Sequence, residues 1–243
     1  MTVSLLSERV EPAKAYASTR YDWCQQLSGR APDSEANESF VSIVTSLLTL
    51  LFAKHRRTGE HSIKTARLAG AVARRCGLTE EETRRIKTGA LLHDIGKLAV
   101  PRAVLYKTTG LTEEEANIMR RHVDDGARVL AGVPRMDAVR AMVRHHHERW
   151  DGDGYPAHLR GEEIPLGARL ITVVDAYDAM TSDRPYRRRL SPLIALERLR
   201  DGAGTQFDPS VVSELVEHLA SGEHAPHERV SDFELPDDFF PAE

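Results

Sequence analysis

The chain has 243 residues, of which 41% are hydrophobic and 29% are charged, a mixture typical of a folded soluble protein. This length is sufficient for one large domain, or for one domain with extensions. The formal net charge of −4 argues against the strongly basic surface that duplex nucleic acid requires. The longest apolar stretch, residues 40–53, contains serine and threonine and is too short to span a bilayer, and no secretory signal precedes it. We therefore expect a cytoplasmic protein without a membrane span.

Apolar residues recur at helical spacing through most of the chain. In residues 40–53 and again in residues 62–76 they follow one face of a helix, and Gly77 supplies a natural stop. Residues 169–180 begin with β-branched side chains, but their length and the absence of partner strands favour a buried helix. The pattern predicts an all-α fold, a single helical bundle.

Four further positions have the chemistry of a helix start. Thr79 and Thr112 are each followed by glutamate three residues later, which is the capping-box pattern, and the first of these opens a helix over residues 79–96. Ser191 and Asp208 are each followed by proline, which is favoured in the first turn of a helix. These signals predict the beginnings of four helices.

The two ends of the chain differ from its middle. We predict an N-terminal extension over residues 1–39 that is partly helical, a domain over residues 40–220, and an acidic C-terminal tail over residues 221–243. The tail holds seven acidic residues against one arginine, a composition typical of a mobile segment. The alternative is that its three phenylalanines dock on the body or on a partner.

The sequence ALLHDIGK, residues 90–97, places an imidazole, a carboxylate and an ammonium group after an apolar run. Burying His93, Asp94 and Lys97 together requires compensation. A bound cation would balance the charge of Asp94, and Lys97 would then suit a bound anion. In the alternative, the adjacent histidine and aspartate simply bond to each other or cap a helix end.

Further histidines lie at the ends of predicted helices, and a second aspartate lies inside an apolar helix. Taken singly, each histidine is more often solvated or hydrogen-bonded than a ligand. Taken together, the set has the chemistry of a two-metal site, in which a carboxylate bridges ions about 3.5–4 Å apart. Mixed nitrogen and oxygen ligation suits iron, manganese or zinc more than magnesium or calcium. The residues are His61, His93, Asp94, His122, His146, His147 and Asp175.

With HHERWDGDGYP at residues 146–156, the chain resembles the HD-GYP family, a branch of the HD-domain metal-dependent phosphohydrolases. The resemblance covers residues 40–220, and the second motif at this spacing is highly specific. It implies a phosphodiesterase that hydrolyses cyclic di-GMP to linear pGpG, and often on to GMP. Attack by a hydroxide that bridges two divalent metal ions, most often iron or manganese, fits that reaction.

The resemblance also assigns roles to particular residues. The seven residues named above become the metal ligands, with Asp94 as the bridge. Asp94 and Lys97 are the expected catalytic residues, and Gly154 and Pro156 shape the loop beside the substrate. The expected substrate contacts are Lys97, Tyr155, Asp178, Arg184 and Arg187.

Two departures from the family pattern lie just before His61. Some members bind a third metal through a glutamate where this chain has Arg57, which cannot bind a metal. We therefore predict two metals, and linear pGpG as the main product. The family often has an aspartate where this chain has His55, which puts one substrate contact in doubt. We expect His55 to be either an adventitious ligand or solvated.

Two other functions are alternatives to this enzyme. The chain could be a low-activity regulatory or adaptor module that binds a cyclic dinucleotide, or a phosphodiesterase of another cyclic dinucleotide or nucleotide. Intact Asp94 and Lys97 argue against a dead site, and the Gly-Tyr-Pro loop argues against a nucleoside triphosphate as substrate. A diguanylate cyclase, an adaptor protein and a second copy of the chain are the expected protein partners.

Overall fold

The computed structural model describes residues 35–183 and 188–222, which are mostly helical. Arg184 and Arg187, most of the N-terminal extension and nearly all of the acidic tail lie outside these residues. Residues 47–223 form one compact unit, which includes the C-terminal part of α2. The elements are α2 (Glu35–Lys54), α3 (Arg56–Arg75), α4 (Glu80–Leu92), η1 (Ile95–Ala99), α5 (Arg102–Leu105), α6 (Glu113–Arg120), α7 (His122–Leu130), α8 (Asp137–His145), η2 (Gly161–Glu163), α9 (Leu166–Thr181), α10 (Pro192–Asp201) and α11 (Pro209–Ala220).

The predicted all-α class is confirmed, since the described residues contain no strand. Capping boxes begin α4 at Thr79 and α6 at Thr112, and side-chain caps begin α10 at Ser191 and α11 at Asp208, as the sequence predicts. Gly77 follows α3 with a φ of 74°, the left-handed conformation that favours glycine. None of the described helices has the length and apolar character that crossing a membrane requires.

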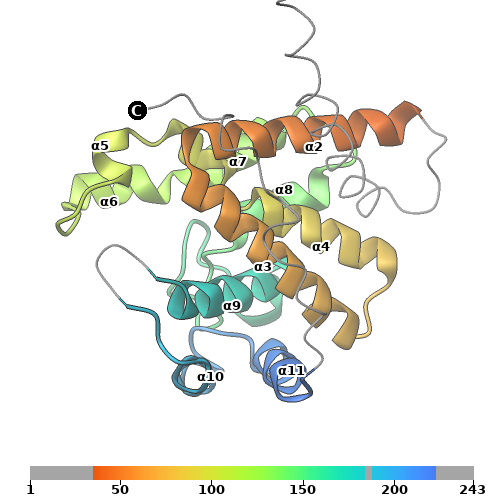
Figure 1. The fold of residues 1–243 in the computed structure, drawn as a ribbon, viewed down its shortest axis with the longest axis vertical. Helices are drawn as coiled ribbons and strands as arrows, with labels where there is room; N and C mark the ends of the chain where they lie inside the picture. The colour runs from red at the N-terminus through yellow and green to blue at the C-terminus, as the bar shows by residue number, and fades with distance from the viewer. Residues whose placement is uncertain (1–34, 184–187, 223–243) are drawn as a thin grey trace, which may run out of the picture. The chain divides into compact units, whose positions relative to one another are not determined.

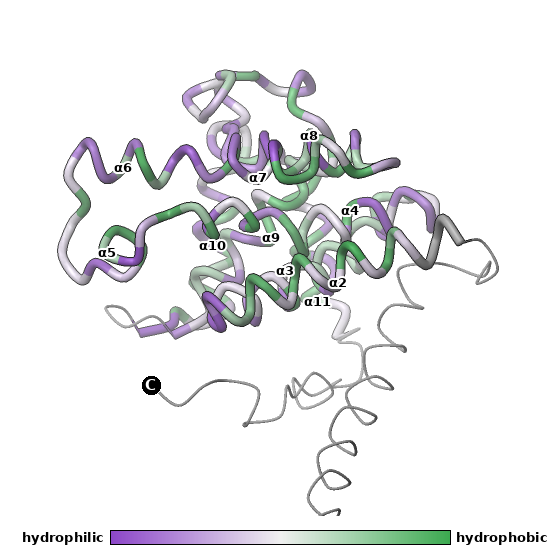
Figure 2. Tube along the Cα trace, turned by 90° about the horizontal axis from the view of Figure 1, so that it is seen from above, coloured by the Kyte–Doolittle hydropathy of each residue, from purple (hydrophilic) through white to green (hydrophobic). Residues whose placement is uncertain are grey.

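Within the compact unit, α3 lies along α4 and also packs against α9, as Figure 1 shows. Helices α10 and α11 cover α9 from below, and η1 packs against α7. Apolar side chains that are fully buried, such as Leu91, Ile171 and Val143, make α4, α9 and α8 the centre of the core. Figure 2 shows apolar and polar stretches alternating along α3 and α4, whereas α6, which buries no residue, is mostly polar.

The structure corrects two predicted helix boundaries, and both matter for the site. Helix α3 begins at Arg56 rather than at residue 62, because the chain breaks only at His55, with φ of −146° and ψ of 74°. His61 therefore lies inside α3. Helix α4 ends at Leu92 rather than near Gly96, and the chain then tightens into η1, where the Lys97 amide donates to the Asp94 carbonyl.

Candidate metal centre

The structure gathers all seven predicted ligands in one place, at the ends of some helices and inside others. The rings of His61 and His93 are 5.4 Å apart between centroids, and those of His93 and His146 are 5.0 Å apart. His147 follows at 4.1 Å from His146. Two groups have ligand atoms within 4.8 Å of one another: His122 with His146 and His147, and His61 with His93 and Asp94.

Three of the histidines are oriented in the same way by their own helix turns. The Nδ1 atoms of His93, His122 and His146 lie 2.7–2.8 Å from the carbonyl oxygens of Ala90, Met119 and Val143, each three residues earlier. A carbonyl only accepts, so each Nδ1 carries the proton and each Nε2 presents a lone pair. Such an outer hydrogen bond fixes the tautomer and the ring direction of a histidine ligand.

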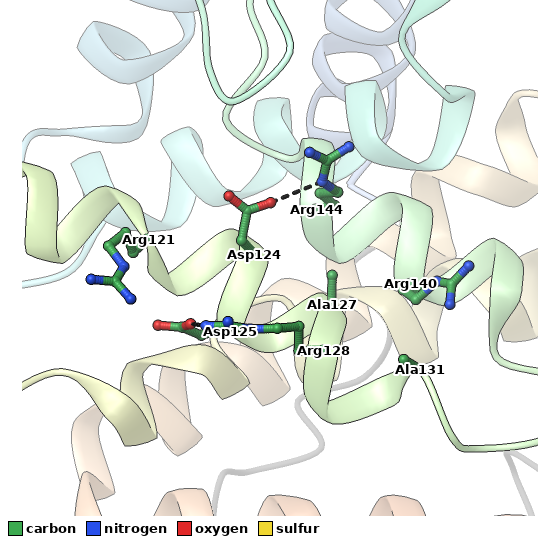
Figure 3. Close-up of a pocket in the computed structure, with 8 residues that line it drawn as sticks. All are labelled: Arg121, Asp124, Asp125, Ala127, Arg128, Ala131, Arg140 and Arg144. Carbon is green, nitrogen blue, oxygen red and sulfur yellow. Dashed lines mark hydrogen bonds and ion pairs between the residues drawn. The ribbon is translucent and has the colours of Figure 1, made fainter.

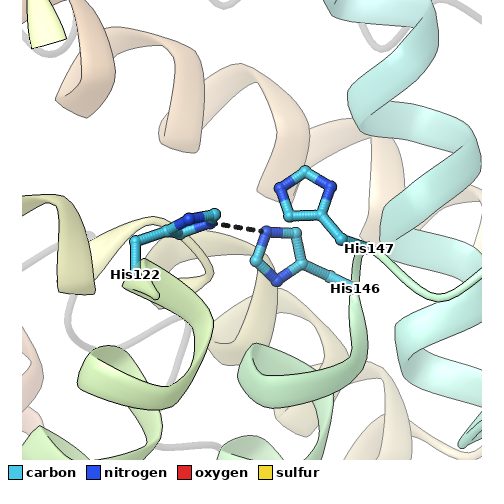
Figure 4. Close-up of side chains that lie close together, drawn as sticks. All are labelled: His122, His146 and His147. Atoms are coloured by element: carbon cyan, nitrogen blue, oxygen red, sulfur yellow. Dashed lines mark hydrogen bonds between the residues drawn. The ribbon is translucent and has the colours of Figure 1, made fainter. Parts of the chain in front are cut away.

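The two buried rings of His122 and His146 point their Nε2 atoms at each other, 3.4 Å apart (Figure 4). Both Nδ1 atoms already carry the proton of a neutral ring. A hydrogen bond between the two Nε2 atoms would therefore require one ring to be protonated on both nitrogens and so to be charged. Burial holds the pKa of His122 below its usual value and that of His146 well below it, so both rings are neutral at neutral pH. Burial, aided by the nearby His122, also lowers the pKa of His147 to about 4. Neutral imidazoles whose lone pairs converge fit a bound divalent cation.

Asp94 belongs to the group of His61 and His93 and also faces His122 of the other group. Its Oδ1 is 3.5 Å from His122 Nε2, and its Oδ2 is 3.4 Å from His93 Nε2 and 2.5 Å from Lys97 Nζ. Burial alone would raise the pKa of this carboxyl, but Lys97 and His93 outweigh it and hold the pKa well below its usual value. An ionised carboxylate with one oxygen toward each group has the geometry of a bridging ligand.

The third part of the site pairs His61 with two aspartates of α9. His61 Nε2 is 2.8 Å from Asp175, and His61 Nδ1 is 2.5 Å from Asp178. Burial would lower the pKa of His61, but these hydrogen bonds outweigh it and raise the pKa to about 10. Asp178 therefore orients a predicted ligand. Its predicted contact with the substrate stays a prediction.

The Gly-Tyr-Pro loop folds back over the histidines. The ring of Tyr155 stacks on that of His147, with centroids 5.0 Å apart and planes 23° apart, and its amide donates to the His147 carbonyl. Gly154 is required here, because a Cβ would lie 2.3 Å from the amide nitrogen of Arg149 and 2.5 Å from Glu148 Cα. Tyr155 is thus placed beside His147, a candidate ligand, and its predicted contact with the substrate stays a prediction.

The prediction that His55 is solvated is wrong. This side chain is 2% exposed, so it is not solvated, and it belongs to neither group of candidate ligands. Its Nδ1 lies 2.7 Å from the Tyr106 hydroxyl, whereas its Nε2 is buried and has no hydrogen-bond partner among the described residues. Arg57, by contrast, is exposed on α3.

A separate open groove of about 580 Å³ lies between α7 and α8 (Figure 3). Four arginines line it, and Arg144 pairs across the groove with Asp124 at 2.9 Å. None of the predicted site residues lines this groove. It is distinct from the metal centre.

Sequence reasoning assigned no role to three residues that support the site. Thr172 on α9 places its hydroxyl 2.7 Å from the His146 carbonyl, and Gly96 allows η1 to approach α7. Glu148 is 1% exposed although its side chain ends in a carboxyl group. Its place within the motif HHE was the only available signal, because threonine and glycine at these positions resemble ordinary helix residues.

The fold is all-α, and its helices bring histidines and aspartates together at one buried site. This combination is typical of a metal-dependent HD-type domain. The model of the family described as "HD domain" matches residues 45–211, and the chain belongs to that family. The predicted resemblance to its HD-GYP branch is confirmed.

Several curated relatives are named as phosphodiesterases of cyclic dinucleotides. The chain is 45% identical over 155 residues to the "cyclic di-GMP phosphodiesterase response regulator RpfG" of Xanthomonas campestris, which covers 63% of the chain and 41% of that protein. It is 34% identical over 186 residues to "3′3′-cGAMP-specific phosphodiesterase 2" of Vibrio cholerae, which covers 76% of the chain and 36% of that protein. The chain thus spans less than half the length of these relatives.

Solved structures share the fold at low identity. A cyclic GMP-AMP phosphodiesterase of V. cholerae, V-cGAP3, superposes with a TM-score of 0.60 at 20% identity, covering 80% of this chain and 53% of that one. An HD-GYP-type protein of Bdellovibrio bacteriovorus gives 0.57 at 18% identity, covering 90% of this chain and 75% of that one.

Proposed function

We propose that the chain is a metal-dependent phosphodiesterase that hydrolyses cyclic di-GMP to linear pGpG. The observation that supports this most directly is Asp94, one oxygen of which faces Nε2 of His93 while the other faces Nε2 of His122 in the second group of candidate ligands. Two divalent ions at such a site supply an activated water and stabilise charge on a phosphoryl group. The relatives named as cyclic di-GMP phosphodiesterases support this choice of substrate.

Different residues of the site would bind the metal ions and contact the substrate. His93, His122 and His146 would hold the ions through Nε2, with orientations fixed by backbone carbonyls. Lys97, whose ammonium group lies beside Asp94, is placed to neutralise charge that develops on a phosphoryl oxygen. The ring of Tyr155 would border the bound substrate. Arg184 and Arg187, which lie outside the described residues, stay predicted phosphate contacts.

The metal number and identity belong to the same proposal. Arg57, at the position where some relatives ligate a third ion, supports two metals and a reaction that stops at pGpG. Iron and manganese are the proposed ions, because both accept mixed imidazole and carboxylate ligation. The cytoplasmic location, the domain boundaries and the protein partners, including a second copy of the chain, stay predictions.

The decisive experiment is chromatography of the products after manganese- or iron-loaded protein is incubated with cyclic di-GMP. We expect a persistent pGpG peak for the wild-type chain and none for Asp94→Asn, which keeps the shape of the bridging group but removes its charge. Untouched substrate with two bound metals would refute the enzyme and favour the regulatory module.

A specific observation supports a second substrate. Several relatives are named as specific for 3′3′-cGAMP, at 33–37% identity. The same assay with 3′3′-cGAMP as a competing substrate gives the ratio of kcat/KM values directly. A ratio that favours 3′3′-cGAMP would move the assignment to that dinucleotide and leave the metal mechanism intact.

A further inference from the structure

Glu148 is a buried carboxylate that follows directly after His146 and His147. Its side chain is fully buried, although an isolated buried charge is costly. Its Oε1 accepts a hydrogen bond of 2.7 Å from the amide of Ala157, nine residues later, and lies 3.2 Å from His145 Nδ1. One oxygen of Glu148 therefore ties the end of the Gly-Tyr-Pro loop to the end of α8.

The contacts around Glu148 close the loop at three points. The Ala157 amide bonds to Glu148 after the loop, the Tyr155 amide bonds to the His147 carbonyl within it, and Gly154 lies directly against the Glu148 backbone. The first of these is the only one made by a side chain. Only Pro156 lies between Ala157 and Tyr155, whose ring stacks on that of His147.

The second oxygen of Glu148, Oε2, is buried and has no hydrogen-bond partner. Glu148 lines a small cavity of about 10 Å³, together with Trp150, Arg169 and Thr172. That volume is close to the minimum for one water molecule.

We propose that Glu148 is a positioning residue for Tyr155: by holding the Ala157 amide, it fixes the tyrosine ring over His147 at the substrate pocket. This inference rests on the proposed function in one respect, namely that Tyr155 borders the bound cyclic dinucleotide. Glu148 neither binds metal nor touches substrate. Glu148 restricts the movement of the loop that carries Tyr155. Its loss should therefore weaken substrate binding more than it slows the chemical step.

The test uses the metal-loaded protein with Glu148→Ala, and with Glu148→Gln as the conservative variant. Glutamine keeps a carbonyl oxygen for the Ala157 amide, so it should restore most of what alanine loses. Asp153→Ala is the matched control, because Asp153 is an exposed acidic residue of the same loop. Should Glu148→Ala fail to fold, Glu148→Asp replaces it, since its carboxylate is one methylene too short to reach the amide.

Two measurements are made on these variants. Hydrogen exchange of the segment that includes Ala157 should quicken about tenfold in Glu148→Ala and stay near wild type in the other two. Steady-state kinetics of Glu148→Ala with cyclic di-GMP should show KM raised about fivefold to tenfold and kcat within about twofold of wild type. The metal content of the variant should equal that of wild type. Combined with Tyr155→Ala, Glu148→Ala should add little further, because both act on one contact.

The outcomes separate this inference from the proposed function. Unchanged exchange in Glu148→Ala overturns the inference whatever the activity, and so do effects that simply add to those of Tyr155→Ala. Loss of metal in Glu148→Ala also overturns it, since that result would make Glu148 a support of the histidines. An inactive wild-type chain would refute the proposed function only, and the exchange measurement would then decide the role of Glu148 in holding the loop.

Discussion

Replacing Gly96 with alanine should dismantle the metal centre without touching a ligand. Gly96 lies in η1, directly against the first turn of α7. A Cβ at Gly96 would lie 1.9 Å from the His122 carbonyl oxygen and 2.6 Å from the Gly126 amide nitrogen. Both neighbours are backbone atoms, so no side chain can rotate out of the way.

The size of the effect follows from these distances. Cβ contacts shorter than 3.0 Å are essentially never observed, so η1 and α7 would have to separate by about 1.1 Å. A metal site tolerates errors of only about 0.2 Å in its ligand distances, and this movement would separate Asp94 from His122. Such overpacking costs about 1–3 kcal/mol, which lowers the Tm of a domain of this size by roughly 2–12 °C.

The assay is metal content by elemental analysis, together with thermal unfolding of the loaded protein. We expect Gly96→Ala to bind less than half of the wild-type metal and to melt earlier. Gly110→Ala is the control, because a Cβ there would meet no atom within 4 Å. Wild-type metal content and an unchanged Tm in Gly96→Ala would refute the close approach of η1 and α7.

Three further predictions test other parts of the site and its support. Lys97→Ala should lower kcat about 100-fold with metal content intact, and loss of metal instead would make Lys97 structural. Thr172→Val should weaken metal affinity about tenfold by freeing the His146 carbonyl, measured by competition with a chelator; unchanged affinity would contradict that role. Asp208→Ala should destabilise the protein by about 3 kcal/mol at pH 7, since it leaves Arg169 partly buried and unpaired.

The Asp208 prediction has a defined pH dependence. Burial would raise the pKa of this carboxyl, but hydrogen bonds from Ser210 and Arg169 outweigh it and lower the pKa. Its contribution is therefore complete above the unfolded pKa of about 3.9 and is lost as the pH falls through the lower folded value. Denaturant unfolding of wild type and variant should converge in acid, and a constant difference would contradict the pairing.

The sequence by itself determined the fold class and the identity of the candidate ligands. Capping boxes at Thr79 and Thr112 are local chemistry, so they formed as predicted. The pairing of His93 with Asp94 after an apolar run pointed to the site because buried charges need compensation, and the resemblance to the HD-GYP family supplied the full set of candidate ligands. Both inferences depend on interactions between residues that are close in the chain.

Only the tertiary structure decided what lies opposite each of these residues. It placed Asp178 on His61 across 117 residues, and it buried His55 against Tyr106, where the sequence predicted exposure or ligation. It also gave Gly96 and Glu148 their roles, because close approach and burial depend on which segments the fold brings together. The local sequence pattern determines which side chains share one face of a helix. The packing of helices against one another determines which residues those side chains contact.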